Sequence, residues 1–258
     1  MRAANPVTFR SGPLPYSSVS GIARLRCAAV VASGLCGLAL QFGTIGPVAA
    51  QDAKKDLFPG MAPVEQYRMA SRSEEIALAR SAAPASISND AEILVLGDHD
   101  FETAVKGKNG FVCLVERSWS ASFGDAEFWN AKIRAPLCLN PAAVSSVLPI
   151  DLEKTRWALA GLSKAEMVVR TKSSVAAHQA PAPGAMSYML SKEQRLSDAD
   201  GHWHPHLMFF EPHTAVATWG ANLPGSPVFG SEGGPEEATV FYVPVAKWSD
   251  GTSASGGM

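Results

Sequence analysis

Alternating apolar and polar positions predict a first group of β-strands near the middle of the chain. The segments Ile93–Leu96, Phe101–Lys106 and Phe111–Arg117 are apolar or alternate over the length of a strand. Asn109-Gly110 lies between the last two, and this dipeptide between alternating segments is a strong signal for a hairpin turn. We therefore expect an antiparallel meander of about three strands here.

Two stretches carry helical patterns. Val64–Ala82 is rich in helix formers with loosely amphipathic spacing, and Pro84 should end it, so we expect a packing helix. Residues 141–178 favour two or three shorter helices, with a break at Pro149. Ser163-Lys164-Ala165-Glu166 has the form of a capping box for the last of these helices.

The last third of the chain returns to strand patterns, in Met186–Leu190, Gly201–His213 and Thr239–Val245. An aromatic segment without a clear period, 118–140, follows the first group of strands and carries Cys138. This order predicts a single α+β domain. Its antiparallel β-sheet should have the helices inserted between the early and the late strands.

The first 50 residues have the three parts of a secretory signal peptide. Residues 1–26 contain four arginines and no acid, Cys27–Phe42 is a short apolar run, and Val48-Ala49-Ala50 offers small residues for cleavage. An uncleaved membrane anchor is the alternative, although the apolar run is short for a spanning helix. The expected boundaries are 1–50 for the signal peptide, 51–62 for a flexible leader, 63–248 for the domain and 249–258 for a disordered tail.

The charge of the chain limits which partners the protein can be expected to bind. Four of the 22 basic residues and none of the 24 acidic residues lie in the expected signal, so its cleavage changes the formal net charge from −2 to −6. A chain without a basic run does not fit nucleic acid as a partner, whereas a small-molecule or protein partner stays open. After cleavage we expect no stable membrane span and a periplasmic or secreted location.

Two cysteines, Cys113 and Cys138, remain in the expected mature chain. In an exported protein such a pair predicts one disulfide. Two metal thiolates or two free thiols are the alternatives, but neither cysteine belongs to a C-x-x-C pair or lies beside a histidine.

The stretch Gly201–His213, GHWHPHLMFFEPH, holds four of the six histidines. Residues two apart in an extended segment face the same way, about 7 Å apart, so His204 and His206 should emerge side by side. Neutral imidazole suits a divalent transition metal such as zinc, iron or copper, and a carboxylate completes many such sites. The candidate metal ligands are His202, His204, His206, Glu211 and His213.

The pattern His204-x-His206-x4-Glu211, with Gly220 further on, resembles the first metal-binding motif of the cupin family. The resemblance covers about 20 residues and implies that these side chains bind a metal. In the family's second motif a histidine follows Pro-x-Gly, whereas Pro224-Gly225-Ser226 has no histidine after it. The chain as a whole resembles secreted bacterial proteins for which no activity is known, and this likeness implies export but no reaction.

Two functional hypotheses follow. The first is an exported protein that binds a divalent metal in the His202–His213 stretch, with hydrolysis or oxygen chemistry open and no catalytic residue assigned. The second is a non-catalytic binding or structural module of the cell envelope whose histidines only pack. Other polar residues are expected to have ordinary roles: Glu116 and Arg117 as surface charges, and Asp98-His99-Asp100 as a solvated turn. The alternative for this triplet is that it adds metal ligands or an acid–base pair.

Overall fold

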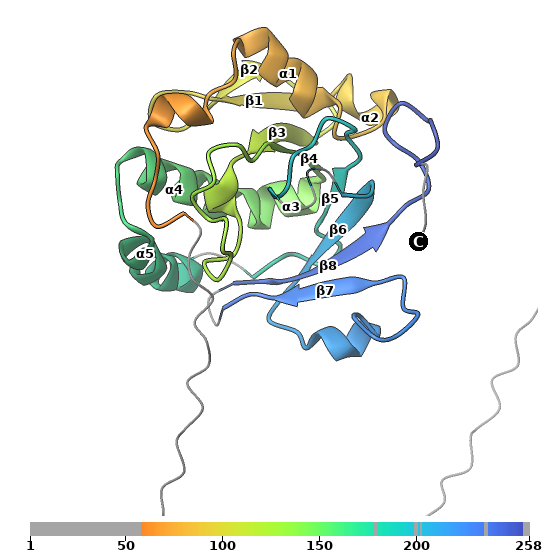
Figure 1. The fold of residues 1–258 in the computed structure, drawn as a ribbon. Coiled ribbons are helices and arrows are strands. Elements are labelled where there is room, and N and C mark those ends of the chain that lie inside the picture. Colours follow the sequence, from red (N-terminus) through yellow and green to blue (C-terminus); the bar gives the residue numbers. More distant parts are fainter. Residues whose placement is uncertain (1–57, 178–179, 199–200, 202, 235–236, 255–258) are drawn as a thin grey trace, which may run out of the picture. The chain divides into compact units, whose positions relative to one another are not determined.

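In the computed structural model, an eight-stranded sheet carries helices on both faces (Figure 1). The structure describes residues 58–177, 180–198, 201, 203–234 and 237–254. The helices are η1 (Val64–Tyr67), α1 (Arg72–Arg80), α2 (Ala85–Ser88), η2 (Ser118–Ser120), α3 (Pro141–Ser146), α4 (Leu148–Leu159), α5 (Lys164–Ala177) and η3 (Val216–Trp219). The strands are β1 (Glu92–Leu96), β2 (Phe101–Val105), β3 (Val112–Glu116), β4 (Ala135–Leu139), β5 (Met186–Met189), β6 (His206–Glu211), β7 (Phe229–Glu232) and β8 (Thr239–Pro244).

The strands follow the order β2-β1-β3-β4-β5-β6-β8-β7. Every neighbouring pair is antiparallel except β1 and β3, which are parallel. Helices α3, α4 and α5 lie in the sequence between β4 and β5. The predicted α+β class, with helices between early and late strands, is therefore confirmed.

The predicted three-strand meander is wrong in its pairing. Strand β2 pairs with β1, and the chain then crosses to the other side of β1, so no hairpin forms at Asn109-Gly110. Backbone bonds hold this crossing: Lys108 N donates to Asp90 O (2.8 Å). At Gly107 a Cβ would lie 2.2 Å from the Glu92 nitrogen, so glycine is required where the two backbones pass.

Alternation along β3 divides the core into two layers. Val112 and Leu114 pack in the cluster that contains residues of α3, α4 and α5, and we call this side the α4 face. Cys113 and Val115 pack against Leu78 and other residues of α1, on the side that we call the α1 face. Successive residues of β3 thus point into different helix layers.

The helix predicted over Val64–Ala82 is divided into η1 and α1. Two buried or partly buried arginines donate hydrogen bonds to backbone carbonyls where the two helices are separated. Arg117 Nε donates to Tyr67 O (2.7 Å), and Arg134 Nη2 donates to Arg68 O (3.0 Å). These carbonyls are thereby satisfied outside a helical ladder. Ser71 then begins α1 by accepting a hydrogen bond from Glu74 N (3.2 Å).

Cys113 and Cys138 lie directly opposite each other on β3 and β4, with their Cα atoms 4.0 Å apart and their sulfurs at disulfide distance. Both residues are fully buried. The predicted pairing is therefore supported. The expectation that Cys138 lies in an irregular excursion is wrong, because residues 135–139 form a strand of the sheet.

Arg117 is fully buried rather than a surface charge, because its side chain enters the α1 face. Its Nη2 donates to Glu75 Oε1 (2.8 Å), and the same oxygen accepts a hydrogen bond from Leu96 N (3.1 Å). Glu75 is a residue of α1 and its side chain is 5% exposed. This ion pair joins α1 to the ends of β1 and β3.

The described C-terminal residues, which end at Ala254, are joined to the domain by backbone hydrogen bonds. Ser249 N donates to Leu190 O (2.9 Å), and Ala254 N donates to Ala246 O (2.9 Å), so the expected disordered tail starts with hydrogen-bonded residues. The expected signal peptide and residues 51–57 of the expected leader lie outside the described residues. Among the helices that the structure describes, none has the length and apolar character needed to cross a membrane.

We predict that Glu75→Ala and Arg117→Ala will each lower the free energy of unfolding by about 3–5 kcal/mol, because each leaves a buried charge without its partner. A Glu75→Leu/Arg117→Met double variant should recover most of this loss. Urea denaturation measures all three. The control is Asp98→Ala, which removes an ion pair to Arg68 in which the aspartate is 80% exposed, and it should cost less than about 1 kcal/mol. Equal losses in the buried and exposed pairs would contradict the assignment.

Candidate functional site

His206 begins β6 and points to the α4 face, in the same row as Met208 and Phe210. The residue is 1% exposed. Its Nδ1 lies 2.7 Å from the backbone oxygen of His204, so the ring donates this hydrogen when Nδ1 carries the proton. The local cause is the strand alternation, which buries every second residue from His206 onward.

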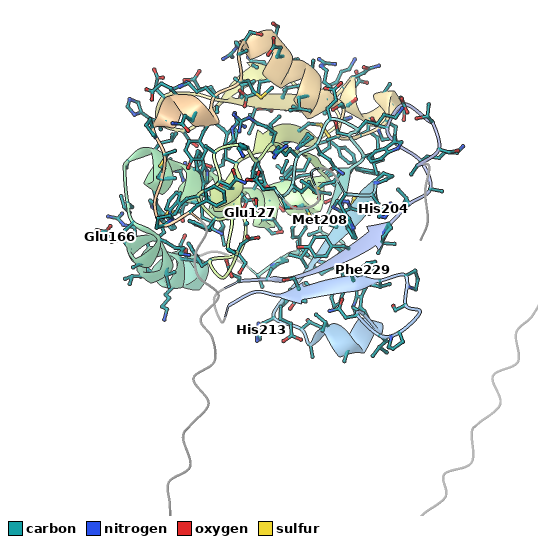
Figure 2. The ribbon with its side chains drawn as sticks, in the orientation of Figure 1. Glu127, Glu166, His204, Met208, His213 and Phe229 are labelled. Carbon is teal, nitrogen blue, oxygen red and sulfur yellow. A yellow bond between two sulfur atoms is a disulfide. The ribbon has the colours of Figure 1, made fainter. Side chains whose placement is uncertain are left out.

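The other predicted metal ligands that the structure describes do not converge with His206 on one point. His204 is half-buried and precedes the strand, whereas Glu211 ends it and His213 is exposed beyond it. Five residues of strand separate His206 from Glu211 by roughly 16 Å, far beyond the reach of one ion. Figure 2 shows His204 and His213 at opposite ends of β6. His202 lies outside the described residues.

Within the described ranges, no group of three or more histidine, cysteine, aspartate or glutamate side chains could hold a metal ion. His206 instead packs among aromatic rings: its ring centroid lies 4.8 Å from that of Trp203 and 5.9 Å from that of Tyr242. Burial lowers the pKa of His206 to about 4, so the ring is neutral at pH 7. This environment is that of a packed core histidine.

A second polar group lies on the α4 face, at the end of β3. Glu116 follows Val112 and Leu114 in the buried row of this strand, and its carboxyl group lies close enough to that of Asp151 on α4 for the two groups to change each other's pKa. Two carboxyl groups this close repel each other when both are charged, and a hydrogen bond joins them only when one carries a proton. Both residues are half-buried, so the pair is not sealed from solvent.

Burial is the main cause of the altered acidity of this pair. It raises the pKa of Glu116 well above its usual value, and the neighbouring charge of Asp151 raises it further. Burial also raises the pKa of Asp151 to about 6, against the opposing effect of the Lys154 charge. Both shifts mean that the pair keeps a proton to a higher pH than isolated carboxyl groups do.

Lys154 lies one helical turn after Asp151 and is 4% exposed. Its Nζ donates to Ala121 O (2.8 Å) and lies 3.5 Å from Glu237 Oε1. Glu237 in turn accepts a hydrogen bond from Ser122 Oγ (2.8 Å). A buried cation thus stands beside the carboxyl pair and joins α4 to the segments that follow β3 and β7.

Two serine hydroxyl groups without hydrogen-bond partners come shortly after Glu116 in the sequence. Among the residues that the structure describes, the buried Oγ atoms of Ser118 and Ser120 have no hydrogen-bond partner. The η2 turn that carries them packs on α4, where Trp119 Nε1 donates to Thr155 Oγ1 (3.0 Å). Buried hydroxyls without partners are uncommon and are natural positions for a bound water or ligand atom.

Tyr242 connects the carboxyl pair to the aromatic group around His206. It lies on β8 opposite Met208, on the α4 face. Burial raises the pKa of Tyr242 to about 12, and the negative charges of Asp125 and Glu116 add to this effect. The phenol is therefore protonated at neutral pH and lies within electrostatic range of the pair. The pair, Lys154, the two serines and Tyr242 form the candidate site.

The interpretation of Glu116 as a surface charge is wrong, and a signal against it was present in the sequence. Position 116 has the same parity as Val112 and Leu114, so a regular strand turns it toward their face. Asp151 and Lys154 also share one side of a helix, because residues three apart are neighbours there. Their meeting with Glu116 depends on helix packing, which the sequence pattern does not reveal.

The turn Asp98-His99-Asp100 is held by ion pairs at the surface. Asp98 lies 2.6 Å from Arg68 Nη2, and Asp100 lies 2.7 Å from Arg156 Nη1. These two aspartates therefore join the β1–β2 turn to Arg68, which precedes α1, and to Arg156 on α4.

Comparison of the chain with known protein families, with curated proteins and with solved structures finds no match in any of the three. Every functional argument for this protein therefore depends on its own residues.

We predict that His206→Leu will remove part of the acid sensitivity of the fold. The unfolded histidine takes up its proton near pH 6.5, but the folded one does so only near pH 4. The contribution of neutral His206 is thus complete above pH 6.5 and is lost as the pH falls to about 4, by about 3 kcal/mol in total. Urea denaturation at pH 7 and pH 4 measures the difference between variant and wild type, which should shrink by this amount. His213→Leu, at an exposed position, is the control, and an equal effect there would refute the assignment.

Proposed function

We propose that this protein is an exported hydrolytic enzyme in which Glu116 and Asp151 act as a general acid–base pair. The observation that carries the proposal is the approach of the two carboxyl groups to each other beside the buried Lys154. Such pairs, in which one proton is shared, suit reactions that need an acid and a base at once. Environments that separate the acidities of two neighbouring carboxyl groups are typical of catalytic sites.

The proposed chemistry assigns a different role to each carboxyl group. Glu116, whose pKa is raised by burial and by the charge of Asp151, holds the proton and gives it to an oxygen or nitrogen of the substrate. Asp151, whose charged form is favoured by Lys154, accepts a proton from an attacking water. After one turnover the proton has moved from Glu116 to Asp151, and exchange between the hydrogen-bonded groups restores the starting state.

The surroundings of the pair suit a small polar substrate. The hydroxyl groups of Ser118 and Ser120 can bind polar substrate atoms, since both lack partners among the described residues. Tyr242 supplies a protonated phenol at the other side of the pair. The histidines have a packing role in this proposal, because His206 is buried among aromatic rings.

Two features support export. One is the N-terminal pattern of basic residues, an apolar run and small residues before Gln51. The other is the buried pair Cys113 and Cys138, whose sulfurs lie at disulfide distance, as is common in oxidising compartments.

The test is a hydrolysis screen of wild type, Glu116→Gln and Asp151→Asn. Chromogenic carboxylic esters, phosphate esters, glycosides and small amides serve as substrates. We expect turnover of one substrate class, and a fall in kcat of about 10²- to 10⁴-fold in each variant, which is the usual contribution of a general acid or base. The rate should follow a bell-shaped pH profile, because only the singly protonated pair is active.

Glu193→Gln is the matched control, since Glu193 is an exposed carboxylate in the loop after β5. This variant should keep the wild-type rate. The absence of turnover in all four classes, or turnover that survives both site variants, would refute the proposal.

A further inference from the structure

A separate pocket lies on the α1 face, on the opposite side of the sheet from the Glu116–Asp151 pair. It has a volume of about 270 Å³ and lies between the start of α1 and the β1–β2 turn. Its lining includes Arg68 and Arg72 from the start of α1, Glu75 one turn further, and Asp98 and Glu102 from the other wall.

The floor of this pocket is a buried carboxylate. Glu75 is 4% exposed, and its Oε1 is occupied by Arg117 Nη2 (2.8 Å) and Leu96 N (3.1 Å). Within the part of the chain that the structure describes, no group hydrogen-bonds to the second oxygen, Oε2. This oxygen is not among the fully enclosed atoms without a partner, so it is open to the pocket, where a water or a donor group of a ligand can reach it. The floor therefore calls for a hydrogen-bond donor, and a cationic donor is the strongest kind.

The rim carries charges of both signs. Arg68 forms an ion pair with Asp98 at 2.6 Å, whereas Arg72 Nη1 lies 3.7 Å from Glu102 Oε2, longer than a direct hydrogen bond. Arg72 Nη2 donates one long hydrogen bond, to Thr103 O (3.4 Å). Arg72 is also 53% exposed along its side chain. Because Arg72 and Glu75 are three residues apart on α1, both side chains lie on the same side of the helix. The pocket thus offers an anion at its floor and a loosely held cation at its rim.

We infer that this pocket binds a small zwitterion with a primary ammonium group and a carboxylate, of the size of a free α-amino acid. The ammonium group donates to Glu75 Oε2 at the floor, and the carboxylate pairs with Arg72 at the rim. The zwitterion brings no net charge, and the charges around the pocket balance when Arg117 is counted, since three arginines then face the three acids Glu75, Asp98 and Glu102. Arg117 already neutralises Glu75 from below, so the ammonium group adds a hydrogen bond rather than the first counter-charge.

The size of the pocket limits the ligand. A volume of about 270 Å³ lies at or below the roughly 300–1,000 Å³ typical of sites for drug-sized molecules. Val95 and Met69 provide the apolar part of the wall, so a short aliphatic side chain fits better than a long charged one. Small apolar or hydroxylated amino acids are therefore the expected ligand class. This site does not depend on the acid–base proposal, because it uses other residues on the other face.

The test is a titration of the whole mature protein, followed by the NMR shifts of the backbone amides of Arg72 and Gly97. The probes are L-alanine and L-serine as zwitterions, with methylammonium chloride and sodium acetate as probes of single charge. We expect saturable shifts with the amino acids, weaker ones with methylammonium, and the weakest with acetate, because acetate reaches only Arg72 at the exposed rim and the floor accepts only a donor. Shifts with acetate alone, or no saturable shift with any probe, would overturn the inference.

Two variants test the two ends of the ligand separately. Arg72→Gln should weaken L-alanine binding by about ten- to a hundredfold, as expected for the loss of one charged hydrogen bond, and leave methylammonium binding unchanged. Glu75→Gln should abolish binding of both, and its folding is checked in the same spectra; if it fails to fold, the comparison of methylammonium with acetate tests the floor. Arg170→Gln on α5 changes an exposed arginine elsewhere and should bind as wild type does. Equal weakening in Arg72→Gln and Arg170→Gln would contradict the site.

Discussion

The structure depends on one constraint at the end of β3, where two successive charged residues enter opposite helix layers. Strand alternation turns Glu116 to the α4 face and Arg117 to the α1 face. A buried charge is tolerated only with a partner, so each layer must supply one. Arg117 obtains Glu75 from α1, and Glu116 obtains Asp151 from α4. The same dipeptide therefore fixes how both helix layers meet the sheet.

The two partnerships have different consequences, because one joins unlike charges and the other joins like charges. Arg117 and Glu75 neutralise each other and give the protein a fixed joint, with one oxygen of Glu75 left facing a pocket. The repulsion between Glu116 and Asp151 favours retention of a proton by the pair. Lys154 acts against this by favouring the charged form of Asp151. Our two proposals use one structural constraint twice, for acid–base chemistry on one face and for ligand binding on the other.

The sequence pattern was informative where local periodicity decides the structure. It predicted the α+β class, the strand segments around β1, β3, β6 and β8, and the pairing of Cys113 with Cys138, because alternation and covalent chemistry act over short distances. The prediction failed at Asn109-Gly110, because the chain passes close to the backbone of β1 at Gly107 and pairs on the other side of β1 instead of forming a hairpin. It also favoured the histidines over Glu116, because histidine clusters are visible in a sequence, whereas the meeting of Glu116 with Asp151 requires the packing of α4 on the sheet.

The central claim is that the Glu116–Asp151 pair keeps a proton to a higher pH than isolated carboxyl groups do. Carboxyl carbon NMR of the protein labelled at aspartate and glutamate side chains measures this directly as the pH is varied. The account predicts two coupled titrations, both above the usual range of carboxyl groups and that of Asp151 near pH 6, with both replaced by a single step in Glu116→Gln. Titration of both carboxyl groups near pH 4, independently of each other, would contradict it.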